Sequence, residues 1–132
     1  MTDELYWLTL SLIATALMAF PYVIERFVVR GLLGAIANHT PEIGEGQSLW
    51  AKRAMSAHRN MVENLVVFAP AVLMLAMLSL STPATRLAAP LFFFARIGHY
   101  FSYALGIPFA RTLLFAAGLV AQLLILFAIL LR

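Results

Sequence analysis

The sequence contains no cysteine and few charged residues, and both absences limit what the protein can be. Without cysteine it has no disulfide, no thiolate metal ligand and no cysteine nucleophile, so any thiol in its chemistry must arrive with a ligand. Only 11% of the 132 residues are charged, whereas 63% are hydrophobic. Soluble domains have about 25% charged residues. We therefore expect an integral membrane protein.

The hydrophobic runs leave little of the chain outside the bilayer. A helix that crosses a membrane needs about 20 apolar residues. The predicted spans are about 5–36, 48–80, 84–105 and 110–131. They predict an all-α, polytopic bundle of four transmembrane helices that forms one domain over residues 1–132. The first residues lack the basic stretch and cleavage site of a signal peptide, so we expect the first run to be kept as a membrane helix.

Turn and breaker residues separate these ranges. The segment 38–47 combines Asn, Thr, Pro and Gly and predicts a loop. Ser48 is a candidate N-cap for the second range. We expect one long first helix with a kink at Pro21, because proline removes a backbone hydrogen bond. The segments 81–83 and 106–108 predict the remaining turns.

The basic residues are unevenly distributed between the two ends of the predicted bundle. Only Arg86 and Arg132 fall at one end. Apart from Arg96, the others flank the first loop or begin the last helix: Arg26, Arg30, Lys52, Arg53, Arg59 and Arg111. Since cytoplasmic flanks are enriched in Lys and Arg, we expect both termini outside and the first and third loops in the cytoplasm. The net charge of +3 forms no basic tract, so we expect no nucleic-acid partner.

Three predicted helices carry polar stripes, all toward the cytoplasmic end. Residues three or four apart share a helix face, and ionisable groups at membrane depth are functional candidates because each is costly unless paired. The stripe of 48–80 is expected to face protein or a water-filled cavity. The stripes are Arg53, Ser56, Asn60, Glu63 and Asn64 on 48–80, Arg96, His99 and Tyr103 on 84–105, and Tyr22, Arg26 and Arg30 on 5–36.

Structural roles stay open for the same residues. Four basic residues lie where side chains snorkel to the interface: Arg26, Arg30, Lys52 and Arg53. Arg59 is spaced for an i,i+4 contact with Glu63, and this pair can be purely structural, as can interhelical hydrogen bonds from asparagine. No metal site is expected, because the three histidines are scattered without ligand spacing. No Ser-His-Asp arrangement or glycine-rich phosphate loop is present.

Two separated strings carry a family resemblance. The first is Arg53-Ala-Met-Ser-Ala-His-Arg-Asn-Met-Val-Glu63-Asn-Leu-Val-Val-Phe68, and the second is Arg96-Ile-Gly-His-Tyr-Phe-Ser-Tyr103, followed by Gly106-Ile-Pro108 and Arg111-Thr112. Together they resemble the MAPEG family, the membrane-associated proteins in eicosanoid and glutathione metabolism, in a bacterial-type form. The resemblance covers all four predicted spans in order.

The resemblance implies a homotrimer in the bacterial inner membrane. Glutathione would bind as cosubstrate between neighbouring subunits near the cytoplasmic face, and a lipophilic substrate would enter from the lipid. By motif position, Arg111 looks like the catalytic arginine that holds the thiolate. The residues that look like glutathione contacts are Arg30 (or Arg26), Arg59, Asn60, Glu63, His99, Tyr103 and Thr112.

The chemistry of glutathione agrees with this assignment. Its thiol is mostly protonated at neutral pH. Arginines suit its two carboxylates, Glu63 suits its ammonium, and Arg111 near a helix N-terminus favours the thiolate. Ser56, Thr112 and Phe115 differ from residues found in many or some members, which counts against the eicosanoid-forming activities specifically.

The leading hypothesis is a glutathione-dependent membrane transferase or peroxidase acting on hydrophobic electrophiles or lipid hydroperoxides. The alternative is a non-catalytic trimeric membrane protein that binds a lipid or an anionic ligand in the same polar pocket. A small transporter is less favoured, because no inverted repeat is evident.

Overall fold

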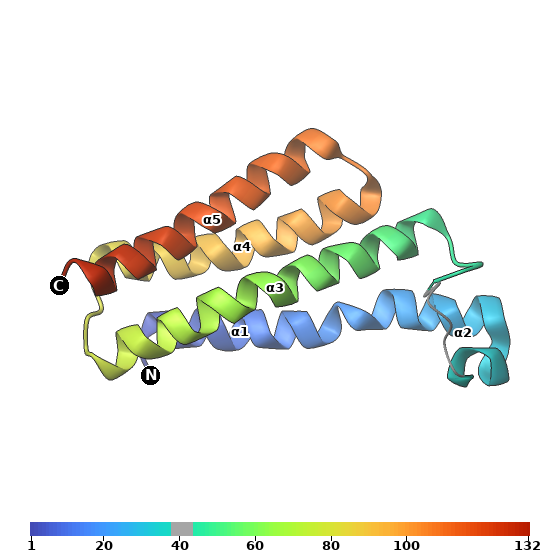
Figure 1. Cartoon of the computed structure of the whole chain (residues 1–132), viewed down its shortest axis with the longest axis horizontal. Coiled ribbons are helices and arrows are strands. Elements are labelled where there is room, and N and C mark those ends of the chain that lie inside the picture. Colours follow the sequence, from blue (N-terminus) through green and yellow to red (C-terminus); the bar gives the residue numbers. More distant parts are fainter. Residues whose placement is uncertain (38–43) are drawn as a thin grey trace.

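The computed structural model describes residues 1–37 and 44–132, and over these it is built of helices. The helices are α1 (Asp3–Leu17), α2 (Ala19–Ile36), α3 (Leu49–Met77), α4 (Pro83–Leu105) and α5 (Pro108–Leu130). They form an elongated bundle (Figure 1). Both termini and the α3–α4 connection lie at one end, and the α4–α5 turn lies toward the other. The predicted all-α architecture is confirmed; the predicted loop at 38–47 lies partly outside the described residues.

The first range is not one straight helix. It breaks at Met18, between α1 and α2. The cause lies three residues later, because Pro21 has no N–H to donate to the carbonyl of Leu17. The Tyr100 hydroxyl of α4 donates to the Met18 carbonyl at 2.9 Å and fixes the break. A second bend occurs at Gly31, whose φ of 70° and ψ of 175° suit glycine.

The other helices begin and end at residues with the expected capping chemistry. Thr82 forms a capping box with Thr85 at the start of α4, and Pro83 occupies its first turn. α4 ends at Gly106, which is left-handed with φ of 73°. Ser48 is the N-cap residue of α3, but its side chain accepts no hydrogen bond; its backbone N–H donates instead to Glu25 Oε1 at 2.8 Å.

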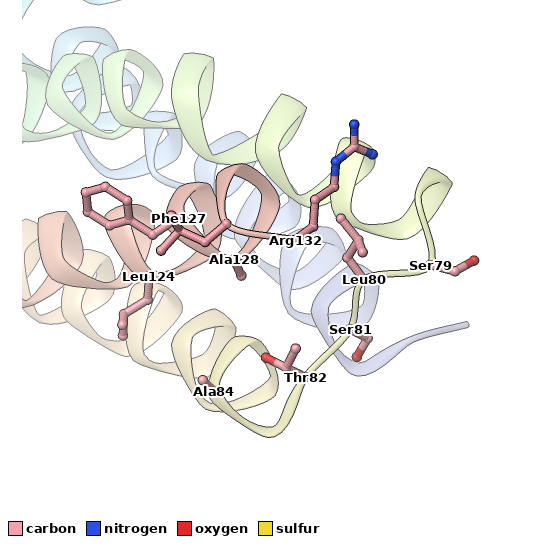
Figure 2. A pocket seen from close by; sticks show the side chains of 10 residues that line it. Ser79, Leu80, Ser81, Thr82, Ala84, Leu124, Phe127, Ala128 and Arg132 are labelled. Carbon is pink, nitrogen blue, oxygen red and sulfur yellow. The ribbon is translucent and has the colours of Figure 1, made fainter.

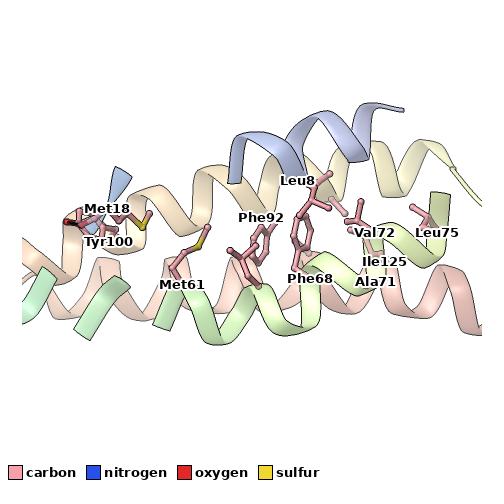
Figure 3. Close-up of a cluster of buried hydrophobic side chains, with 14 of the residues drawn as sticks. Leu8, Met18, Met61, Phe68, Ala71, Val72, Leu75, Phe92, Tyr100 and Ile125 are labelled. Carbon is pink, nitrogen blue, oxygen red and sulfur yellow. Dashed lines mark hydrogen bonds between the residues drawn. The ribbon is translucent and has the colours of Figure 1, made fainter. Parts of the chain in front are cut away.

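The apolar core runs along the bundle where α1, α3, α4 and α5 meet (Figure 3). Phe68 of α3 stacks on Phe92 of α4, with ring centroids 3.7 Å apart and planes at 7°. Small buried residues such as Ala57 and Ala95 let the helices approach closely. This packing fixes the relative rotation of α3, α4 and α5, and therefore which of their polar residues face one another.

The helices have the length and composition of a membrane protein. Within the described chain, three segments are long and apolar enough to cross a bilayer: Asp3–Ile36 with its bends, α3 and α5. α4 is 23 residues long but is not among them. It carries Arg86 and Arg96 and packs against α1, α3 and α5. That α4 is a fourth span stays a prediction.

Candidate functional site

The centre of the candidate site is a buried arginine on α4. Arg96 is 1% exposed and lies about 20 Å along α4 from Pro83. Its Nη2 donates to Asn60 Oδ1 of α3 at 2.6 Å, while its Nε and Nη1 are buried without a hydrogen-bond partner among the described residues. Its guanidinium carbon also lies 5.6 Å from the Phe115 ring centroid on α5. A charged group buried this deeply would be costly in a membrane, so the position is a functional candidate.

A chain of amide groups extends from this arginine across the bundle. The Asn64 side chain donates to the Asn60 carbonyl at 2.8 Å and to its Oδ1 at 3.3 Å. Gln122 of α5 is 4% exposed and donates to Asn64 Oδ1 at 2.7 Å. The network therefore joins α3, α4 and α5 by polar contacts in an otherwise apolar interior.

The network fixes the orientation of the Asn60 amide. Arginine is only a donor, so the oxygen of Asn60 must face Arg96. That oxygen receives hydrogen bonds from Arg96 and Asn64, which use its two acceptor positions. Only the N–H groups of the Asn60 side chain stay available. A ligand atom that meets this side chain must therefore be an acceptor, such as a carbonyl or carboxylate oxygen.

The predicted residues of α4 and α5 lie together near the α4–α5 turn. The Arg111 guanidinium carbon is 4.8 Å from the Tyr103 ring centroid, a cation–π distance. His99 is 4% exposed, and its ring centroid is 5.7 Å from that of Tyr103 and 6.3 Å from that of Phe115. Thr112 is exposed and its hydroxyl donates to the Pro108 carbonyl of its own helix. His99, Tyr103 and Arg111 thus lie together, and Phe115 contacts both His99 and Arg96.

Two predicted residues of α3 lie on a different surface. Arg59 and Glu63 are exposed on the outward face of the helix, together with Val62 and Val66, which are 45% and 70% exposed. The predicted Arg59–Glu63 contact does not form, and neither side chain has a partner within the described chain. The stripe is therefore divided in the single chain, because Asn60 and Asn64 point inward while Glu63 points out; that the whole stripe faces protein or a water-filled cavity stays a prediction.

The arginines of α2 lie apart both from the residues near the α4–α5 turn and from Arg59 and Glu63. Arg30 donates to the Glu45 carbonyl at 2.8 and 3.3 Å, and Arg26 Nε donates to Gln47 Oε1 at 3.2 Å. Tyr22 hydrogen-bonds His58 Nδ1 at 2.6 Å. In the described chain α2 contacts α1 and α3 but neither α4 nor α5. A single chain therefore does not bring Arg30 to Arg111.

Three residues of the network were not among the predicted site residues. Arg96, Asn64 and Gln122 are polar positions in apolar ranges, and Arg96 and Asn64 belong to the predicted stripes. A polar residue within an apolar range is visible in the sequence, but the contacts of these three residues with one another depend on the rotation of three helices.

Comparison with known proteins gives a family. The sequence model of the MAPEG family matches residues 5–131, nearly the whole chain. Neither the curated proteins nor the solved structures gave a match.

Proposed function

This chain belongs to the MAPEG family of membrane proteins, which has glutathione-related functions, and we propose that it is a glutathione-dependent transferase or peroxidase. Its substrates are hydrophobic electrophiles or lipid hydroperoxides that reach the site from the bilayer. The observation that carries the proposal is the position of Arg111. It is half-buried in the first turn of α5 and held against Tyr103, whose ring contacts the buried His99.

Arg111 is placed to favour a thiolate. The N-terminus of a helix carries a partial positive charge, which adds to the charge of a guanidinium in the first turn. A nearby cation and a helix N-terminus both lower the pKa of a thiol. Arg111 would therefore hold the sulfur of glutathione as its reactive anion. The N–H groups of Asn60 suit a carbonyl or carboxylate oxygen of the same molecule.

Arg59 and Glu63 on the outer face of α3, together with Arg30 of α2, complete the site in a homotrimer. Arg59 and Glu63 are exposed on α3 near the depth where its apolar half begins, and exposed charges there are costly unless another subunit covers them. Covered by a neighbouring subunit, Glu63 would bind the ammonium of glutathione, and Arg59 with Arg30 its carboxylates. The proposed site thus lies between subunits, at the cytoplasmic side of a bacterial inner membrane.

The same thiolate serves both reactions. With an electrophile, sulfur forms a bond to carbon as the leaving group departs or as the double bond takes up a proton. With a lipid hydroperoxide, sulfur attacks the terminal oxygen, the O–O bond breaks and the alcohol leaves after protonation. A second glutathione then displaces water from the sulfenic acid and gives the disulfide. Both reactions need the thiolate close to lipid.

Calorimetry of glutathione binding to the detergent-purified protein tests the proposal. We expect saturable binding that falls at least about tenfold in both Arg59→Ala and Glu63→Ala, because each removes one charge-assisted contact. Arg86→Ala is the matched control, since it removes an arginine at the other end of the bundle and leaves binding unchanged. Folded protein that binds no glutathione would instead favour a different thiol or a non-catalytic role.

The role of Arg111 is tested by the ultraviolet absorbance of the bound thiolate and by turnover of a model electrophile. We expect Arg111→Ala to keep its affinity for glutathione within a few-fold of the wild type. The variant should lose the thiolate signal, and its turnover should fall about 100-fold, as when an electrostatic catalytic group is removed. Arg111→Lys keeps a charge and should recover part of both. An Arg111→Ala variant with thiolate and turnover intact would remove Arg111 from the mechanism.

A further inference from the structure

A buried carboxylate lies at the end of the bundle that holds both chain termini. Glu4 of α1 is 1% exposed. Its Oε1 accepts hydrogen bonds from the hydroxyls of Ser81 and Thr85, at 2.7 and 2.6 Å. Its Oε2 is buried without a hydrogen-bond partner among the residues described. A buried carboxylate oxygen without a donor is unfavourable, so a hydrogen-bond donor from outside the chain would stabilise this atom.

Two adjoining cavities surround this end of the bundle. The smaller, about 200 Å³, is lined by Glu4, Thr2, Ser79 and Ser81 among others. It exceeds the roughly 15 Å³ that one water requires. The larger, about 560 Å³, shares Ser79 and Ser81 with it. Its lining runs from these serines of the α3–α4 connection to the apolar side chains of α5, which Figure 2 labels. The two cavities therefore share a polar edge, and the larger one also has apolar walls.

Two arginines lie at the same end of the bundle as the carboxylate. Arg86 Nε donates to Ser81 Oγ at 3.3 Å, and the same hydroxyl donates to Glu4. Arg132 lines the larger cavity, whose apolar walls include Leu124 and Phe127. The site thus offers a buried anion, nearby guanidinium groups and an apolar groove. A molecule complementary to it carries a hydrogen-bonding cation, an anion and a hydrocarbon chain.

We infer that this site binds phosphatidylethanolamine from the bilayer. The primary ammonium of the headgroup donates to Glu4 Oε2, the phosphate lies toward Arg86 and Arg132, and an acyl chain follows the groove of Leu124 and Phe127. This site is separate from the candidate glutathione site, and its test does not depend on the proposed enzyme activity.

The chemistry of the site selects among lipids and ions. Phosphatidylcholine has the same phosphate, but its quaternary ammonium has no N–H to donate to Glu4. Phosphatidylglycerol has the phosphate and no cation. Calcium or magnesium takes six or more oxygen ligands. Among the described residues, no three or more His, Cys, Asp or Glu side chains lie close enough together to hold a metal ion, so a divalent ion is poorly matched.

Native mass spectrometry of the full chain in detergent tests the inference. The probes are phosphatidylethanolamine, phosphatidylcholine and phosphatidylglycerol with identical acyl chains at equal concentration. We expect the wild type to retain the ethanolamine lipid about tenfold better than the choline lipid, a typical effect of one hydrogen bond to a charged group. Glu4→Gln should abolish this preference. Asp3→Asn, which removes the adjacent exposed carboxylate, should preserve it.

Two further arms separate the parts of the ligand. Arg86→Gln should weaken retention of the ethanolamine and glycerol lipids alike, because both carry the phosphate. Soluble phosphoethanolamine should not displace the lipid at equal concentration, since it lacks the acyl chains. Equal retention of the ethanolamine and choline lipids by the wild type overturns the inference without any variant. The inference is also overturned if folded Glu4→Gln keeps the full preference for the ethanolamine lipid over the choline lipid, or if soluble phosphoethanolamine displaces the lipid.

Discussion

At the scale of single residues, the candidate site depends on how one buried arginine is held. Arg96 has one hydrogen bond to a side chain within the described chain, to Asn60, and that contact orients the amide toward a ligand. In the proposed mechanism Arg96 acts through Asn60, while Arg111 is the cation that holds the sulfur. The two arginines lie on different helices, and they are not interchangeable.

The hydrogen bond between Arg96 and Asn60 predicts how much stability its loss would cost. Asn60→Ala should lower the free energy of unfolding by about 1–3 kcal/mol, because it leaves the Arg96 guanidinium without its partner on α3. Unfolding in mixed micelles measures this. Thr112→Ala is the control; its hydroxyl bonds only its own helix, and its loss should cost no more than about 0.5 kcal/mol. Equal stability of both variants would show that the Arg96–Asn60 contact is not stabilising.

At the scale of helices, the close approach of α4 and α5 makes room for the arginine. Gly118 of α5 lies against Arg96: an added Cβ would be 3.2 Å from its Cδ and 3.4 Å from its Nη1. A larger residue at this position would occupy the space of the guanidinium. Small residues at such contacts are what allow helices to pack closely in membranes.

Gly118→Leu should therefore destabilise the bundle by about 1–3 kcal/mol, the usual effect of adding volume to a packed interior. It should also weaken glutathione binding, because Arg96 and with it Asn60 must move. Thermal unfolding and calorimetry measure the two effects. Ala116→Leu, on the exposed face of the same helix, is the matched control and should change neither. Normal binding by Gly118→Leu would contradict the link between helix packing and the site.

At the scale of the whole molecule, the two ends of the bundle differ in charge. The basic residues of α2, α3 and the start of α5 lie toward the end with the α4–α5 turn, while the termini share the end with Glu4 and Arg86. The proposed glutathione site and the proposed lipid site therefore occupy opposite ends. The positive-inside rule predicts that the termini are outside.

The absence of cysteine allows a clean test of this orientation. Single cysteines at Thr2 and at Glu45, both exposed, would be the only thiols in the protein. We expect a membrane-impermeant maleimide to label position 2 in intact cells and position 45 only after the membrane is opened. The reverse pattern would place the termini in the cytoplasm and contradict the predicted topology.

Much of the architecture follows from the sequence because it depends on local physics. Long apolar runs require helices in lipid, since each backbone polar group must be satisfied within its own segment. Pro21, Ser48, Pro83 and Gly106 mark helix breaks or ends through the backbone geometry that they permit. Spacing along α3 and α4 likewise identified the polar faces. The bend at Gly31 was missed, because glycine permits a bend without requiring one.

Only the tertiary structure decided which polar residues meet. Neighbours on one stripe separate: Asn60 points to Arg96, whereas Glu63 points out of the bundle, because α3 packs with one face against α4. Glu4 near the start of the chain meets Thr85, 81 positions later, which no local pattern encodes. The sequence determined a helical membrane protein and its family motifs, because these rest on composition and local spacing. The contacts of each site depend on helix rotation and close packing, which only the folded chain sets.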